Sequence, residues 1–573
     1  MRKLINKLFS HLSLIGKSLL QTKIFFISAV ILVVFYLANY SFINNDHSNL
    51  GGSFSHLTGS TIKFTNNWLN DGVINDKFTM LEKPLSIESK TINDREPYIS
   101  YPSGTILVTY GIAKTFGYSQ VDAAFVKNVN TTLYALDALL IGILFFLILQ
   151  YLFKMKSTIG KIILPALLSS LWIVLPSNTY YLKNVFFADQ LVLFFIYLLL
   201  VLELLKNYAD IKKSKSKKVI DILLFMTIVL GILTDYYFWI QLFVLCLINF
   251  FTPLLQKKTF IHSVKSIALY LIAALLGVGL YFIQLIQIEN WWFILSDKAK
   301  FRMGFAESLS DKSLIEVLIE RITVAYDFSG LLFFGIFTSC LILLICLNVF
   351  KKRMAQKKRL KDNFLIFSLL IILPPYLQLF ALNNHAVGHE FSILKLGLPF
   401  VFGFLLVAYT IFVLYKQPVH LDLEIELKEK NCRKNLNSYA LLVVILVIGF
   451  LLSSRFSQHR YLYSMYRSYS QSYDMELVVN SMNRYENVFF SYTDSIPTNP
   501  PQSLAIAKKM VYKIEKLTDI KDQFPDLDNK AVVLVLINEN AQKSEEIEEE
   551  ENYVMKNFQQ VKREGNYVIY QIQ

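Results

Sequence analysis

The chain has 573 residues, of which 54% are hydrophobic and 14% aromatic, which is too apolar for a soluble protein of this length. Its formal net charge of +13 would suit a nucleic-acid-binding protein, but the basic residues lie in short loops between apolar runs. We therefore expect no nucleic-acid partner and predict a polytopic α-helical membrane protein.

Eleven apolar runs predict about 11 transmembrane helices, since a helix of about 20 apolar residues crosses a bilayer. The first run follows a basic, amphipathic N-terminus and has no small-residue cleavage site after it, so we expect a retained first span. The pair at 220–255 is short and is either two tilted helices or a partly re-entrant pair. The runs are 24–43, 133–153, 159–175, 187–205, 220–233, 238–255, 266–285, 331–350, 364–382, 396–415 and 439–452.

The loops between the runs set the predicted orientation. The basic segments KSKSKK, LLQKK and KKRMAQKKRLK are expected in the cytoplasm, together with the N-terminus. Four segments then lie outside: 44–130, 286–328, 385–395 and the tail from 454. We expect an integral protein of the bacterial inner (plasma) membrane. None of the four cysteines lies in an outer segment, so no structural disulfide and no cysteine metal site are expected.

The chain divides into a transmembrane domain, 1–453, and an extracytoplasmic domain, 454–573. The tail alternates helical and strand patterns, which favours a small α/β domain. It lacks a glycine-rich phosphate loop, so no nucleotide is expected there. The predicted helices are 475–486, 503–517 and 544–561, and the predicted strands are 487–493, 531–540 and 566–573.

The loop 44–130 is the first candidate for chemistry. Asp46 follows the first span closely, and the same loop carries WLNDG at 68–72 and the aromatic, proline-containing REPYISYPSG at 95–104. A carboxylate at a span end is often only a loop residue or a helix N-cap. The concentration of polar and aromatic residues favours a loop that works at the membrane surface.

The second candidate is NNHAVGHEFSILK, just before a late span. His385 and His389 share a helix face at a spacing of four, but Glu390 follows the second histidine, so the zinc-protease pattern H-E-x-x-H is absent. The simpler interpretation is a pair of interfacial histidines that cap a span. Lys395 either snorkels to the interface or holds a lipid phosphate.

Acids at the ends of spans and one amphipathic loop complete the candidates. Asp189 in NVFFADQLVLFF and Asp235 in LTDYYFW lie at a depth where a carboxylate is costly and usually functional. The loop IENWWFILSDKAKFRMGF joins aromatic interface residues to Lys298, Lys300 and Arg302, and it is typical of an interfacial helix.

In its order of motifs and topology, the sequence resembles the GT-C superfamily of membrane glycosyltransferases. The closest types are protein O-mannosyltransferases and aminoarabinose transferases, which use polyprenyl-phosphate sugars. The similar features are an acid after the first span, W-L-N-D-G and the Pro/Tyr-rich segment in a long first outer loop, FFADQLVLFF, LGILTDYYFWIQLF and HAVGHEFSILK. Where many relatives have an Asp-Glu pair, this chain has the single Asp46.

The resemblance implies transfer of a monosaccharide from a polyprenyl-phosphate donor to a glycan, lipid or protein acceptor on the outer face. Asp46 would be the general base, and Arg95, Arg302 and Lys395 would stabilise the leaving phosphate. The other substrate-binding candidates are Tyr98, Tyr101, Asp189, His385, His389 and Glu390. Membrane lipids are further partners, no nucleotide is needed, no metal ligand is assigned, and a role for a divalent cation stays open.

Three other functions compete with this one. A polymerase or ligase would transfer a lipid-linked oligosaccharide, and a non-catalytic scaffold would recruit partners through its tail. A transporter or flippase for a lipid-linked or anionic solute would place charges in the middle of its spans. Here nearly all acids lie at span ends and in outer loops.

Overall fold

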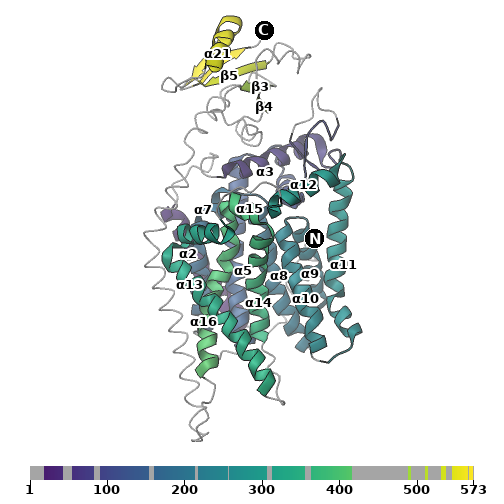
Figure 1. Ribbon diagram of the computed structural model, residues 1–573, viewed down its shortest axis with the longest axis vertical. Helices are drawn as coiled ribbons and strands as arrows, with labels where there is room; N and C mark the ends of the chain where they lie inside the picture. The colour runs from purple at the N-terminus through teal and green to yellow at the C-terminus, as the bar shows by residue number, and fades with distance from the viewer. Residues whose placement is uncertain are drawn as a thin grey trace.

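The structure is a computed structural model, and most of it is a bundle of long helices (Figure 1). It describes residues 19–42, 54–82, 91–153, 160–212, 217–255, 257–305, 313–354, 363–415, 488–491, 510–513, 531–536, 545–564 and 567–571. The candidate base Asp46 and the last apolar run, 439–452, lie outside these residues.

Within the described residues, seven helices are long and apolar enough to cross a membrane, or eight if one bent pair counts as a single span. This confirms the polytopic helical class, while the predicted number of 11 stays unconfirmed. The long helices are α2 (Leu19–Phe42), α5 (Ala123–Leu147) with η2 (Ile148–Leu152), α6 (Gly160–Ile173), α8 (Ala188–Lys212), α9 (Lys217–Ile232), α10 (Tyr236–Leu255), α11 (Phe260–Leu285), α13 (Leu314–Met354), α14 (Asn363–Ala381) and α16 (Gly397–Tyr415).

Two predicted runs differ clearly from the helices observed, and a third feature, the pair at 220–255, is resolved. The run 159–175 ends at Ile173, and the chain bends by 67° into α7 (Pro176–Asn184), where Pro176 occupies a first-turn position that needs no N–H donor. The run 331–350 belongs to a helix that begins at Leu314, because the polar residues before it also favour a helix. The pair at 220–255 forms two helices joined by the turn 233–235.

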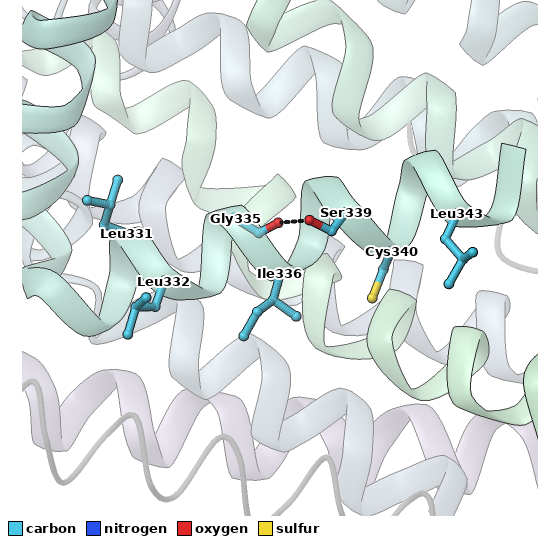
Figure 2. Close-up of a pocket in the computed structure, with 7 residues that line it drawn as sticks. All are labelled: Leu331, Leu332, Gly335, Ile336, Ser339, Cys340 and Leu343. Carbon is cyan, nitrogen blue, oxygen red and sulfur yellow. Dashed lines mark hydrogen bonds between the residues drawn. The ribbon is translucent and has the colours of Figure 1, made fainter. Parts of the chain in front are cut away.

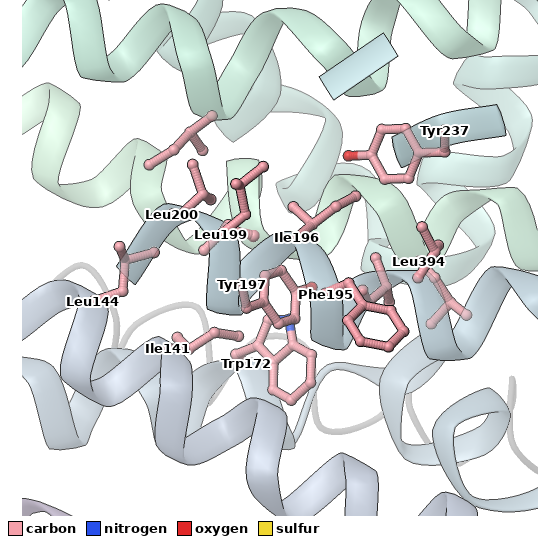
Figure 3. Close-up of a cluster of buried hydrophobic side chains, with 14 of the residues drawn as sticks. Ile141, Leu144, Trp172, Phe195, Ile196, Tyr197, Leu199, Leu200, Tyr237 and Leu394 are labelled. Atoms are coloured by element: carbon pink, nitrogen blue, oxygen red, sulfur yellow. The ribbon is translucent and has the colours of Figure 1, made fainter. Parts of the chain in front are cut away.

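The core of the bundle is aromatic. Trp172 of α6 packs edge-on against Tyr197 of α8, with ring centroids 5.8 Å apart (Figure 3). It also packs edge-on against Tyr134 of α5, with ring centroids 5.5 Å apart. The helices α8 and α16 are central, since 83% of the apolar stretch Ala188–Asn207 and 94% of Glu390–Ile411 are buried, against 22% for α11. Asp189 and Lys395 therefore belong to the two most enclosed segments.

Short elements from distant parts of the chain gather at one end of the bundle, the upper end in Figure 1. Thr58 of α3 bonds to the carbonyl of Asn184, Lys298 of α12 bonds to Ser100, and Asn384 of α15 bonds to α12. Three of the four predicted outer segments, 44–130, 286–328 and 385–395, thus contribute residues to the same end. The elements are α3 (Ser55–Asn67), η1 (Trp68–Gly72), β1 (Met80–Leu81), β2 (Pro97–Tyr98), α4 (Gly104–Thr115), α12 (Trp291–Met303), α15 (Asn383–Gly388) and η3 (Glu390–Leu396).

The described strands of the tail form a five-stranded sheet of order β4-β3-β5-β7-β6. In it β3 (Val488–Ser491) is parallel to β4 (Met510–Lys513) and β5 (Ala531–Leu536), and β7 (Tyr567–Gln571) is antiparallel to β5 and to β6 (Gln559–Glu564). The acidic segment forms α21 (Glu545–Asn557).

Two predicted helices of the tail were partly wrong. The strand β4 lies within the expected helix 503–517, and β6 begins before the expected end of the helix 544–561, because pairing with β3 and β7 in the sheet outweighs local helix propensity. That the tail is a separate domain outside the membrane stays a prediction.

One glycine fixes how α4 meets the turn between α9 and α10. The Gly104 amide donates to the Leu233 carbonyl at 2.6 Å, and a Cβ at Gly104 would lie 2.3 Å from that oxygen. This contact sets the distance between the Tyr98–Tyr101 segment and Asp235.

We therefore expect Gly104→Ala to lower the melting temperature of the purified protein, through strain of about 1–3 kcal/mol. The matched control is Gly111→Ala in the same helix, where a Cβ meets no atom within 4 Å. That change should stabilise α4 by about 0.5–1 kcal/mol. Equal melting temperatures for the two variants would show that the close approach has no energetic consequence.

Candidate active site

A buried ion pair lies at the centre of the gathered elements. Lys395 Nζ donates to Asp189 Oδ1 at 2.6 Å, and at most 1% of either side chain is exposed. Asp189 occupies the first turn of α8, where the helix dipole favours an anion. Lys395 also lies 5.4 Å from the ring centre of Tyr237. Both charges are satisfied within the protein, so Lys395 is not a freely available cation.

Tyr101 and His385 extend this pair into a network. The Tyr101 hydroxyl lies 3.2 Å from His385 Nε2 and 3.5 Å from Asp189 Oδ2. Burial lowers the pKa of His385, although Asp189 opposes this, so the imidazole is neutral at pH 7. Burial also raises the pKa of Tyr101 well above its usual value. The network thus offers neutral hydrogen-bonding groups around one fixed carboxylate.

Asp235 is a second buried carboxylate at this site. Its Oδ1 accepts a hydrogen bond from the Tyr237 backbone N–H at 2.6 Å and so caps the start of α10. Its Oδ2 has no partner among the described residues. Burial, together with the negative charge of Asp189, raises the pKa of Asp235 to about 6. Oδ1 of this carboxylate therefore stabilises the helix start, whereas Oδ2 has no structural contact of this kind among the described residues.

Two cations of α12 cover the tyrosines of the Tyr98–Tyr101 segment. Lys298 Nζ donates to Ser100 Oγ at 3.0 Å and lies 5.3 Å from the ring centre of Tyr98. Arg302, one turn later, donates to the Ser100 carbonyl at 2.7 Å and lies 4.4 Å from the ring centre of Tyr101. Burial and the charge of Arg302 lower the pKa of Lys298.

In the part of the chain that the structure describes, neither of these cations has a carboxylate within ion-pair distance. By contrast, the exposed Lys300 on the same helix lies 3.8 Å from Asp297. The inward side of α12 therefore offers positive charge that neutral oxygens and aromatic faces hold in place, which is an arrangement that suits an anion.

Two sequence candidates lie in structural ion pairs instead. Arg95 donates to Asp71 at 2.6 Å and to Asp76 at 2.7 Å, so two carboxylates already neutralise it. Glu390 pairs with Arg321 at 3.0 Å, and about 39% of its side chain is exposed. Neither residue joins the network around Asp189, and we do not assign either one to the substrate.

The histidine motif is split between two environments. His385 joins the Asp189 network, whereas His389 stacks on Phe391, with ring centroids 5.0 Å apart, and lies 4.6 Å from the His385 ring. Phe54, at the start of α3, packs against both His389 and Phe391. The first outer loop and the late histidine motif thus meet, as a shared site requires.

Asp235 and Lys298 were named from the sequence without a role in the site, and Ser100 was not named. An acid in a three-residue turn between apolar runs, followed by YYFW, was the signal for Asp235. The spacing of four between Lys298 and Arg302 was the signal for an inward basic face. Ser100 carries no comparable signal, because its role is to accept and position the two cations.

A cavity of about 450 Å³ lies elsewhere, along α13 (Figure 2). Its polar groups are few, and the Ser339 hydroxyl donates to the Gly335 carbonyl within the helix. No charged residue lines it among the described positions, so we do not regard it as the active site. The lining residues are Leu331, Leu332, Gly335, Ile336, Ser339, Cys340 and Leu343.

A divalent cation, whose role the sequence leaves open, would need a group of metal-ligating side chains. The described residues contain no group of three or more His, Cys, Asp or Glu that are placed to hold a metal ion. In the network, Lys395 already compensates the charge of Asp189. The described groups thus suit an anion, and a role for a divalent cation stays open.

No protein-family model and no curated protein matches this sequence. Among solved structures, one similar chain is the archaeal oligosaccharyltransferase AglB from Archaeoglobus fulgidus, in complex with an inhibitory peptide and a dolichol-phosphate. The match has a TM-score of 0.49 and 10% identity, and it covers 84% of this chain and 64% of that chain. At this identity no residue role carries over, and the assignment of function rests on the site itself.

The raised pKa of Asp235 predicts a pH-dependent effect on stability. A carboxylate whose folded pKa lies above its unfolded value destabilises the fold progressively as pH rises from the unfolded value to the folded value, and fully above the folded value. Asp235→Asn keeps the cap of α10 and removes the charge. At pH 7.5 we expect it to raise the free energy of unfolding by up to about 3 kcal/mol, and the melting temperature with it. Near pH 4 we expect both quantities to stay unchanged. An equal effect at both pH values would show that the Asp235 charge is not responsible.

Proposed function

We propose that this chain is a membrane glycosyltransferase that moves a monosaccharide from a polyprenyl-phosphate donor to a glycan, lipid or protein acceptor on the outer face of the membrane. The observation that carries the proposal is the pair Lys298 and Arg302. They face inward at one end of an apolar helix bundle, beside a buried acidic network, and they have no carboxylate partner among the described residues.

Lys298 and Arg302 would bind the phosphate of the donor. In the reaction, an acceptor hydroxyl oxygen attacks the anomeric carbon, a base takes its proton, and the bond from that carbon to the phosphate oxygen breaks. Negative charge then grows on the departing lipid phosphate. Fixed cations stabilise this charge most where water is excluded. Arg302 supplies two parallel N–H donors for phosphate oxygens, which a lysine cannot do.

Lys395 and Asp189 would act as positioning residues. Their pair joins η3 to the first turn of α8 and fixes Tyr101 and His385 beside it. Lys395 was expected from the sequence to stabilise the phosphate directly, but in the described part of the chain its ammonium group donates to Asp189. Its contribution in this mechanism is to keep Asp189 charged and in place.

Asp46 remains the proposed general base, in a loop outside the described residues. In the sequence it precedes Phe54 by eight residues, and Phe54 packs against His389 and Phe391 beside the network. The described carboxylates suit this task less well, because Asp189 is committed to Lys395 and Asp235 caps α10.

Removal of the inward cations tests the phosphate site. We expect Lys298→Ala and Arg302→Ala each to weaken use of an undecaprenyl-phosphate-linked hexose by roughly 10- to 100-fold, as loss of one charge-assisted hydrogen bond implies. Transfer of labelled hexose to envelope acceptors in reconstituted membranes is the measurement. Lys300→Ala, on the exposed side of the same helix, is the matched control and should behave like the wild type. Equal losses in all three variants would contradict the assignment.

The proposed base has its own test. Asp46→Asn removes the base and keeps the shape, so we expect normal expression and a loss of turnover of roughly 10²–10⁴-fold. Asp71→Asn is the comparison, since Asp71 pairs with Arg95, which keeps Asp76 as a second partner. Its effect on turnover should be milder. Full activity in Asp46→Asn, measured by the same transfer assay, would rule out this base.

A further inference from the structure

The uncommitted oxygen of Asp235 has consequences for substrate choice. Asp235 is 1% exposed, and its Oδ2 has no hydrogen-bond donor in the described part of the protein. Leaving such an atom unpaired in the interior costs about 1–3 kcal/mol. Buried polar groups of this kind are usually completed by water or by a ligand. The question is which donor completes this one.

Neighbouring side chains do not supply that donor, because their own groups are engaged elsewhere. The Tyr236 hydroxyl lies 2.9 Å from the Tyr281 hydroxyl, and the Tyr101 hydroxyl lies between His385 and Asp189. Lys395 donates to Asp189, and Arg302 donates to the Ser100 carbonyl. Lys395 and Arg302 have further N–H groups, but none of them lies within hydrogen-bond distance of Asp235 Oδ2 in the described structure.

The charges around Asp235 indicate the kind of donor. In the candidate site as a whole, Lys298, Arg302 and Lys395 oppose Asp189 and Asp235, which leaves one net positive charge when His385 is neutral. A phosphodiester carries one negative charge, which would neutralise this net positive charge. A cationic donor to Asp235 would restore an excess of positive charge, so a neutral hydroxyl group fits better.

The surroundings also suit a sugar. The Tyr101 and Tyr236 rings stack, with centroids 6.3 Å apart and planes 29° apart, and Arg302 lies over both. The helix α12, which carries Arg302, has no buried residue of its own. Few apolar contacts therefore have to be lost when Arg302 moves from the rings to a phosphate, and the aromatic faces next to Asp235 become available to a ligand.

We propose that Asp235 Oδ2 accepts a hydrogen bond from a hydroxyl group of the transferred sugar and so makes the enzyme selective for donors that carry this hydroxyl. This inference rests on the proposed function, because the sugar enters as part of the polyprenyl-phosphate donor. Asp235 is then a specificity-determining residue, distinct from the cations that hold the phosphate. A site built to bond a substrate hydroxyl strongly rejects the analogue that lacks it, since the protein group is left unpaired.

The test is equilibrium binding of undecaprenyl-phosphate-linked hexoses and their monodeoxy analogues to the full-length protein in lipid nanodiscs. For the wild type we expect one deoxy position to weaken binding by roughly 10- to 100-fold. In Asp235→Ser, which can still cap α10 but leaves nothing at the Oδ2 position, the same ratio should fall to about 1. Asp235→Asn, which keeps the shape and loses the charge, should give an intermediate ratio.

Asp221→Asn is the matched control. Asp221 also has an unpartnered buried oxygen, but it lies near the opposite end of α9, roughly 20 Å away along the helix. It should leave the ratio unchanged. A ratio that persists in Asp235→Ser, or a wild type that binds every deoxy donor equally, would overturn the inference and leave only an ordered water at Oδ2. Failure of the wild type to bind any undecaprenyl-phosphate-linked hexose would overturn the proposed function as well.

Discussion

The burial of two opposite charges, Asp189 and Lys395, is the constraint on which the candidate site depends. Removing either charge from water costs several kcal/mol, and only their direct contact in a well-fitted geometry compensates this. The contact joins residues 206 positions apart and connects the two most enclosed helical segments. Any shift of one segment against the other would leave a charge unpaired in the interior. The positions of Tyr101 and His385 follow from this pair.

The site therefore combines a rigid part with an adjustable one. Asp189 and Lys395 neutralise each other's charge, whereas Lys298 and Arg302 are held by a carbonyl, a hydroxyl and aromatic faces. Exchange of a neutral acceptor for a phosphate oxygen strengthens the hydrogen bond, because the acceptor is then charged. A cation that already donates to a carboxylate would gain little hydrogen-bond strength by donating to a phosphate instead. The inward cations of α12 are for this reason the better phosphate ligands, although Lys395 is the more deeply buried cation.

Sequence patterns predicted the helices of the bundle well, because each depends on a local run of apolar residues. They failed where the outcome depends on distant partners. Arg95 has the appearance of an isolated base in an outer loop, and the acids that neutralise it lie 19 and 24 residues earlier. The segment MVYK has a helical context, yet its pairing with β3 makes it a strand.

The same argument explains what could be foreseen of the site. Asp189, Tyr101, His385 and Arg302 were identified because each stands out locally, as an acid, an aromatic or a base at a span end. Their division into structural pairs and available groups was not predictable, since it depends on which side chain neutralises which.

Asp235 shows why this division matters for function. As a local feature it is only an acid at the start of a helix, and one of its oxygens has that ordinary capping role. The second oxygen has no hydrogen-bond donor among the described residues, in a site whose charged side chains leave one net positive charge for a phosphate to balance. While it is unpaired, this acceptor raises the free energy of the empty site. A substrate hydroxyl that donates to it removes that cost on binding. The cost that the fold carries without substrate thus becomes part of the affinity for the correct sugar.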